Sequence, residues 1–219
     1  MYRILFQHPA FLVIDKQPGI GMHDEGGEPG LLNPGLVSRV KADTGLTLYP
    51  VHRLDKMTSG LVLLARTTEA NRALSMAFAA REVSKQYLAL SDRKPKKKQG
   101  WVKGDMQKGR GGNWMLTRTL DNPAISWFDS VLVREGLRLY RIKPQTGKTH
   151  QIRVALKSIG APILGDERYG GTPADRGYLH AWRLRFTLAN EPFDFVCPPN
   201  LGAEFVTPEL AAAIETLAP

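Results

Sequence analysis

The chain has 219 residues, of which 42% are hydrophobic and 23% are charged, as in an ordinary soluble globular protein. Cys197 is the only cysteine, which excludes an internal disulfide and a cysteine-built metal site. The N-terminus lacks the apolar core of a signal peptide, and no apolar run approaches the ~20 residues of a membrane span. We therefore expect a cytoplasmic protein that makes no membrane contact.

Positive charge is concentrated in one segment of the chain. The formal net charge is +9, and the segment from Arg81 to Arg118 holds eleven basic residues against three acidic ones. A flexible, solvated loop kept soluble by its lysines would explain this run. Trp101 and Trp114 favour nucleic acid as a partner, because aromatic rings stack on bases while cations neutralise phosphates.

Hydrophobic periodicity predicts several strands with a few helices between them. Strands are expected at residues 2–7, 11–15, 61–66, 83–91, 126–135, 137–144 and 178–188. Helices are expected at residues 68–81, with Thr68 as the N-cap, at 149–160 and at 207–218. The two strands around Gly136 are typical of a hairpin, and residues 24–36, rich in glycine and proline, are expected to form a loop.

Hairpin-like strands with a few intervening helices indicate an α+β fold. We expect a mainly antiparallel or mixed central sheet with flanking helices. The sequence shows no internal repeat and no clear linker, so residues 1–219 are predicted to form a single domain. We expect the protein to be a monomer.

No known cofactor or metal motif is complete in this sequence. The stretch "TGKTH" resembles the end of a phosphate-binding loop, but position 142, where that loop needs glycine, is Ile142. The five histidines have no helical i, i+4 pair, and no dinucleotide fingerprint or nucleophile elbow is present. We therefore expect neither a cofactor nor a metal.

Asp55 is unusual because it is a carboxylate in apolar surroundings. It lies in "VHRLDKMTSG" among Val51, Leu54 and Met57. A buried carboxylate costs several kcal/mol unless it is paired or hydrogen-bonded. Taken alone, Asp55 would be interpreted as a turn residue that accepts hydrogen bonds from nearby backbone N–H groups.

The stretch "HRLDKMTSG" resembles the active-site motif H-R-L-D-x-x-T-S-G of the RluA family of RNA pseudouridine synthases. Further stretches resemble the family in the same order: "FLVIDKQPG", "SKQYLAL", "PAISWF", "TGKTHQIRVAL", "PILGDERYG" and "LHAWRLRF". Together they cover roughly residues 10 to 200. The chain departs from the family pattern at Asp15, where asparagine is common, and we expect no separate N-terminal RNA-binding domain.

The resemblance implies the pseudouridine synthase catalytic fold and isomerisation of specific uridines in structured RNA, either ribosomal or transfer RNA. Uridine and pseudouridine have the same formula, which agrees with the empty cofactor inventory. The resemblance also implies that Asp55 is the catalytic residue. It would act either as a nucleophile or as a base, a choice that the sequence leaves open.

Three more residues receive roles from the resemblance. Arg153 matches the family arginine in "HQIR" and would be the cation that favours the ionised form of Asp55. Tyr87 would pack against the target base, and Arg53 would fill the place of a flipped-out uridine. Without the resemblance, Arg153 would be a surface arginine, Tyr87 a core aromatic and Arg53 a phosphate ligand. A non-catalytic RNA-binding protein with the same fold and basic surface is the alternative function.

Overall fold

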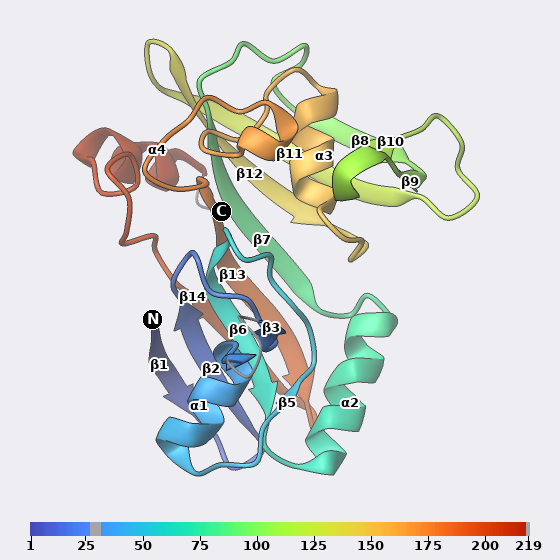
Figure 1. Cartoon of the computed structure of the whole chain (residues 1–219), viewed down its shortest axis with the longest axis vertical. Coiled ribbons are helices and arrows are strands. Elements are labelled where there is room, and N and C mark those ends of the chain that lie inside the picture. The colour runs from blue at the N-terminus through green and yellow to red at the C-terminus, as the bar shows by residue number, and fades with distance from the viewer. Residues whose placement is uncertain (27–31, 218–219) are drawn as a thin grey trace. The chain divides into compact units, whose positions relative to one another are not determined.

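The structure is a computed structural model that describes residues 1–26 and 32–217. The chain divides into two compact units. The first comprises Met1–Ser84 and Ala181–Pro198, and the second comprises Lys85–His180 and Pro199–Pro219. Figure 1 labels the helices and strands and colours them by residue number. This division does not test the expected single domain over residues 1–219, which stays a prediction.

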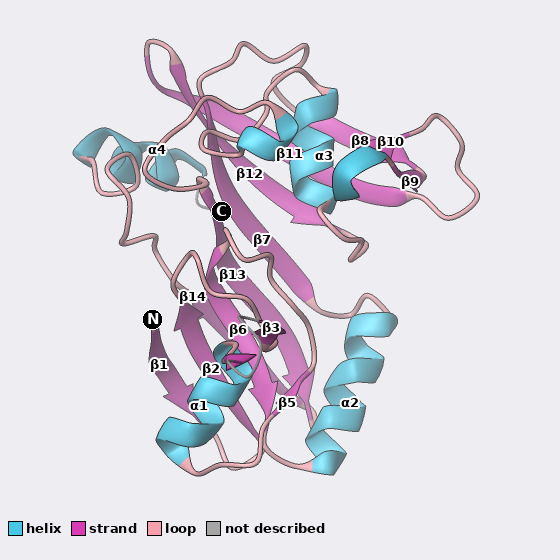
Figure 2. Cartoon of the chain, viewed as in Figure 1, coloured by secondary structure: helices cyan, strands magenta, loops and turns pink. Residues whose placement is uncertain are grey.

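The first unit is built on an antiparallel sheet (Figure 2). Its strands are β1 (Tyr2–Gln7), β2 (Phe11–Lys16), β6 (Ser59–Ala65), β13 (Leu179–Leu188, from Ala181 onward), β14 (Glu191–Val196) and the short β5 (Tyr49–Pro50). β1 pairs with β2, β2 with β6, and β13 with β14, each antiparallel. β2 and β6 are buried along their whole length, so the core of this unit lies around them. The strands expected at residues 2–7, 11–15 and 61–66 are confirmed.

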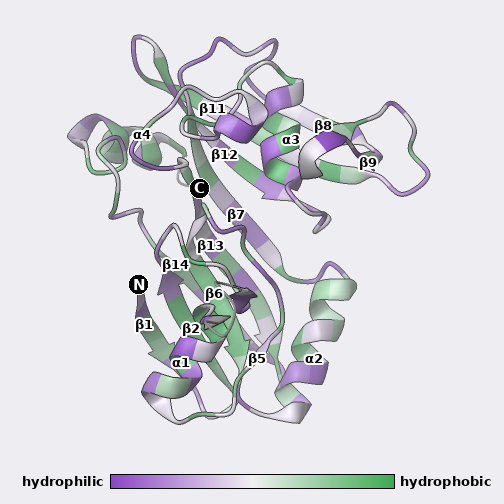
Figure 3. Ribbon diagram, viewed as in Figure 1, coloured by the Kyte–Doolittle hydropathy of each residue, from purple (hydrophilic) through white to green (hydrophobic). Residues whose placement is uncertain are grey.

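Two helices belong to the first unit, α1 (Leu36–Thr44) and α2 (Thr68–Ala79). Figure 3 shows hydrophobic and hydrophilic bands along both helices. The expected N-cap was wrong by one residue: the Thr67 hydroxyl accepts a hydrogen bond from the Ala70 N–H at 3.1 Å. Either threonine could supply that oxygen, but Thr67 is the one with extended backbone.

α1 was not predicted. It follows a segment rich in glycine and proline, buries Leu36, Val37 and Val40, and ends at Gly45, whose φ is 68°. Short strands β3 (Glu25–Gly26) and β4 (Leu32–Asn33) precede it, so the expected loop at 24–36 is only partly correct. Residues 27–31 of that expected loop lie outside the described part of the chain.

The second unit contains a second run of antiparallel strands. In spatial order these are β7 (Ser84–Ser91, from Lys85 onward), β12 (Leu137–Pro144), β11 (Ala124–Arg134) and β8 (Gly100–Gly104). β9 (Met106–Lys108) and β10 (Trp114–Leu116) form a separate small hairpin, with the 3-10 turn η1 (Arg110–Gly112) between them. The predicted hairpin of β11 and β12 is confirmed, and Gly136 at its turn has a φ of 75°.

The two faces of this run of strands carry different residues. Tyr87 and Phe128 both lie opposite Ile142 and therefore share one face, while Leu88 and Asp129 share the other with Arg141. Helix α3 (Gln151–Ser158) is fixed to β11 by the Gln151 side chain, which donates to the Ser126 hydroxyl at 2.9 Å. Helix α4 (Pro208–Leu217) reaches the face of Arg141, whose guanidinium donates to the Leu217 carbonyl.

The α+β class and the mainly antiparallel sheets are therefore confirmed. No helix in the described ranges is long and apolar enough to cross a membrane.

Candidate active site

The predicted catalytic residue, Asp55, lies in the loop that joins β5 to β6 in the first unit. The Asp55 carbonyl accepts a hydrogen bond from the Thr58 N–H at 3.0 Å, which closes a tight turn. Leu54, one residue before it, is buried, whereas Asp55 is only half-buried. The loop thus places its apolar neighbour in the core and leaves the carboxylate within reach of solvent.

Immediately after Asp55, the loop is tied to the end of β2. The Lys56 carbonyl accepts hydrogen bonds from the Gly19 N–H at 2.8 Å and from the Lys16 ammonium at 3.2 Å. Lys16 is fully buried and also donates to the Gln17 carbonyl at 3.0 Å. Burying an ammonium group is costly unless its N–H groups are hydrogen-bonded. The two hydrogen bonds of Lys16 therefore fix the loop to the end of β2. Lys16 was not predicted as a functional residue from the sequence, although a lysine that ends an apolar strand was the available signal.

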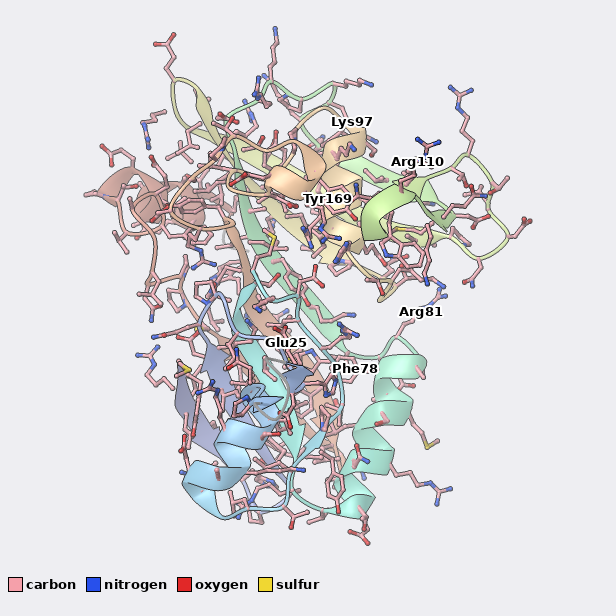
Figure 4. The ribbon with its side chains drawn as sticks, viewed as in Figure 1. Glu25, Phe78, Arg81, Lys97, Arg110 and Tyr169 are labelled. Atoms are coloured by element: carbon pink, nitrogen blue, oxygen red, sulfur yellow. The ribbon has the colours of Figure 1, made fainter. Side chains whose placement is uncertain are left out.

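Before Asp55, the loop is tied to β6 and to α2. The His52 Nε2 atom accepts a hydrogen bond from the Leu63 N–H at 2.9 Å. The imidazole also stacks on Phe78 of α2, with 4.9 Å between ring centroids and 15° between planes (Phe78 is labelled in Figure 4). Since Nε2 accepts, the neutral ring carries its proton on Nδ1. His52 is a second anchor that the sequence analysis did not identify.

Gly60 fixes the point where the loop enters β6. Its φ is 103°, and a Cβ at this position would lie 2.3 Å from the Ala181 carbonyl oxygen of β13. Thr58 and Ser59 just before it are buried. Only glycine satisfies both the backbone angle and the close approach.

We expect Gly60→Ala to destabilise the first unit by more than about 3 kcal/mol, because the added methyl meets backbone and the φ angle is strained. Gly45→Ala is the matched control: its φ is 68° but nothing lies within 4 Å of an added Cβ. That control should cost only about 1 kcal/mol. Urea unfolding of both variants measures the difference, and equal costs would contradict the close-approach argument.

Arg53, two residues before Asp55, is exposed on the same loop. An exposed arginine can rearrange toward a nucleic acid without breaking the core. Both predicted roles, filling the place of a flipped base and binding phosphate, are compatible with this position.

Tyr87 lies on β7 in the second unit, and its side chain is 9% exposed. It shares its face of the sheet with Ile142 and Phe128, both buried. Tyr87 is therefore nearly buried on an apolar part of this face.

Arg153 lies on α3 and is 7% exposed, so its interpretation as a surface arginine was wrong. Its Nε and Nη2 atoms donate to the two carboxylate oxygens of Asp166, each at 2.7 Å. The guanidinium carbon also lies 4.9 Å from the centroid of the Tyr169 ring. A bidentate carboxylate and an aromatic ring together fix the plane of the guanidinium. Asp166 was not singled out in the sequence, although it lies in the stretch "PILGDERYG".

Tyr169, labelled in Figure 4, links this arginine to the β9–β10 hairpin. It lies in the 3-10 turn η2 (Glu167–Tyr169), and its hydroxyl accepts a hydrogen bond from the Trp114 N–H at 3.0 Å. The same hydroxyl lies 2.8 Å from His150 Nδ1. Burial raises the pKa of Tyr169, so the phenol stays neutral near pH 7 and keeps its proton for hydrogen bonding.

The basic segment from Arg81 to Arg118 is not simply a flexible, solvated loop. It contains β8, β9 and β10, and its lysine run is fixed by backbone contacts. The Lys96 N–H donates to the Ile159 carbonyl at 2.8 Å, and the Lys98 carbonyl accepts from the Ser130 hydroxyl at 2.6 Å. Both lysine side chains are nevertheless exposed. The segment therefore presents its charge from a defined backbone.

Comparison with known proteins gives the family. The sequence profile of RNA pseudouridylate synthases matches residues 10–158. The chain belongs to the RNA pseudouridylate synthase family. An uncharacterized RNA pseudouridine synthase of Haemophilus influenzae is 46% identical over 97% of this chain and 94% of its own length. The matched range includes residues of both compact units.

Other pseudouridine synthases agree with this assignment. Ribosomal large subunit pseudouridine synthase C of Haemophilus ducreyi is 30% identical, and the match covers 98% of this chain and 67% of that protein. The protein of the same name from Rickettsia bellii is 33% identical, over 76% of this chain but only 56% of its own length. The human RNA pseudouridylate synthase domain containing 4 structure superimposes with a TM-score of 0.71 at 25% identity, covering 93% of this chain and 90% of that chain.

The resemblance to the RluA family, the pseudouridine synthase fold and the enzyme class are thus confirmed. The chain is a pseudouridine synthase, an isomerase that acts on RNA. The roles of Asp55, Arg53, Tyr87 and Arg153 stay predictions.

Proposed function

We propose that this pseudouridine synthase converts specific uridines of large-subunit ribosomal RNA to pseudouridine, with Asp55 as its catalytic residue. The observation that carries the proposal is the way the Asp55 loop is held. His52 fixes it before Asp55, Lys16 and Gly19 fix it after, and Gly60 with its positive φ ends it. A loop held in this way gives the half-buried Asp55 a defined position, which a reactive group needs.

The reaction needs a single charged group and no added reactant. The bond from N1 to C1′ of the ribose breaks, the uracil turns, and C5 bonds to C1′. C5 then loses its hydrogen and N1 gains one, so atoms balance within the nucleotide. The Asp55 carboxylate can serve as a nucleophile or as the base that removes a proton, and both routes require it to be ionised.

The other three residues surround that chemistry in our proposal. Arg153 is the cation that pairs with Asp55, as the resemblance implies, and Asp166 and Tyr169 hold its guanidinium in one plane. Tyr87 packs against the target base. Arg53, exposed on the loop, occupies the stack that the flipped uridine leaves.

The names of the relatives from Haemophilus ducreyi and Rickettsia bellii support the large ribosomal subunit as the source of the substrate. Transfer RNA is the other substrate that the sequence suggested. Cytoplasmic location and a monomeric state remain expectations.

Mapping pseudouridine in total RNA tests the proposal. We expect loss of the gene to remove one or more pseudouridines from large-subunit ribosomal RNA, and expression of the wild-type protein to restore them. The Asp55→Asn variant should not restore them. Loss confined to transfer RNA would overturn the proposed substrate, and an unchanged map would favour the non-catalytic RNA-binding alternative.

A further inference from the structure

Two tryptophans lie directly opposite each other on the second unit's sheet. Trp101 of β8 is paired with Trp127 of β11, and Trp127 is paired on its other side with Lys143 of β12. Residues in direct register across antiparallel strands have Cβ atoms about 5 Å apart on the same face. The three side chains therefore form one continuous row across three strands.

Two lysine ammonium groups lie against these rings. Lys103 Nζ is 5.0 Å from the ring centroid of Trp101, and Lys143 Nζ is 5.1 Å from that of Trp127. Trp101 is 43% exposed, Lys103 is exposed, and Trp127 and Lys143 are half-buried. These four residues, Trp101, Lys103, Trp127 and Lys143, are called the tryptophan–lysine patch.

The patch lies on the face of the sheet opposite to Tyr87. Arg141 and Asp129, one pleat further along the same face, are ion-paired at 2.6 Å, and Arg141 also donates to the end of α4. At Arg141 this face of the sheet is therefore occupied by the ion pair and by the end of α4. At Trp127 the same face is aromatic and cationic. Asp129, the acidic residue next to the row, has its charge taken up by Arg141.

The chemistry of the patch fits unpaired nucleotides. Two neighbouring indoles offer flat surfaces for two bases, and the two ammonium groups offer counter-charges for the phosphates beside them. A duplex would not use the indoles, because its base faces are already stacked on one another. The core of a protein–protein interface is depleted in charged residues, whereas here each ring is accompanied by a cation.

We propose that the tryptophan–lysine patch is a binding site for single-stranded RNA, which stacks two bases on Trp101 and Trp127 and places phosphates at Lys103 and Lys143. Such a site would let the enzyme bind an unpaired region of its substrate RNA. The proposal rests on the proposed function in one respect, which is that RNA is the ligand.

Binding of a fluorescently labelled oligouridylate of about ten nucleotides to the full chain tests the site. The double variant Trp101→Leu with Trp127→Leu should bind about tenfold or more weakly, since each base–aromatic stack contributes substantially. Replacing both tryptophans with tyrosine should restore most of the affinity, because the flat ring is kept. Leu132→Ala is the matched control, as Leu132 is 60% exposed on the same strand β11.

The charges are tested by salt dependence. Lys103→Gln with Lys143→Gln should flatten the plot of log affinity against log salt by ~0.7 for each phosphate that the variant no longer neutralises. Lys41→Gln with Arg72→Gln, both exposed on the helices of the first unit, removes the same charge and should change the slope less. Binding of a duplex RNA of equal length should be little affected by the leucine variants.

Unchanged oligouridylate affinity in a folded leucine double variant would overturn the proposal, as would an equal loss of duplex binding. A tyrosine double variant as weak as the leucine one would also overturn it, because stacking would then not be the cause. Asp55→Asn should bind the oligouridylate like the wild type. If that variant still isomerised uridine, the proposed function would fail while this binding site stood.

Discussion

Asp55→Asn is expected to abolish isomerisation, by roughly 10⁴-fold or more, while RNA binding survives. Asparagine keeps the size and polarity of the side chain, but it carries no negative charge and is neither a nucleophile nor a base. The backbone of the loop is held by His52, Lys16 and Gly19, none of which contacts the Asp55 carboxylate through these bonds. The substitution should therefore leave the fold intact.

Release of tritium from RNA labelled at C5 of uridine measures the reaction directly, since C5 loses its hydrogen. Binding of the same RNA should be unchanged or slightly tighter, because one negative charge near phosphate is gone. Asp43→Asn is a suitable control: Asp43 is exposed in the same unit and accepts a hydrogen bond from the Tyr2 hydroxyl at 2.7 Å. Turnover by Asp55→Asn near that of this control would refute the catalytic assignment.

The strands and longer helices could be predicted because local pattern determines them. Most of β2 and β6 consists of apolar runs, at residues 11–14 and 61–65, and glycine marks the turn between β11 and β12. The failures have local causes as well. α1 follows glycine and proline and shows only three buried positions, and β9 and β10 have three residues each in a stretch rich in glycine and lysine.

The site was predictable only where the sequence repeats a known motif. Asp55 and Arg153 were assigned to the candidate site by resemblance alone, because their own surroundings favoured a turn residue and a surface arginine. Lys16, His52 and Asp166 were missed since each acts through a partner distant in sequence. Lys16 of β2 contacts the carbonyl of Lys56, and Asp166, which directly precedes η2, contacts Arg153 of α3. Periodicity reports which face is buried, but it does not report which buried polar groups meet.

The Arg153→Ala variant should have a lower free energy of unfolding and a lower isomerisation activity than the wild type. The two effects can be separated. Asp166 is 2% exposed and would be left as a buried carboxylate without its bidentate partner. Breaking such a pair from one side costs about 3–5 kcal/mol, which urea unfolding would detect. Lysine at position 153 should recover part of the stability only, since a point charge cannot reproduce the planar fork.

The double variant Arg153→Met with Asp166→Leu removes both charges and should regain most of the lost stability, because replacing a buried ion pair with apolar side chains is often neutral. If Arg153 only supports the fold, this variant should also regain isomerisation. We expect it to remain inactive, because the cation that our proposal assigns to Asp55 would still be missing. Single-turnover rates at saturating RNA, compared at equal folded fraction, decide between these outcomes. A stable double variant with wild-type rates would limit Arg153 to a structural role and leave Asp55 to be supported by other groups.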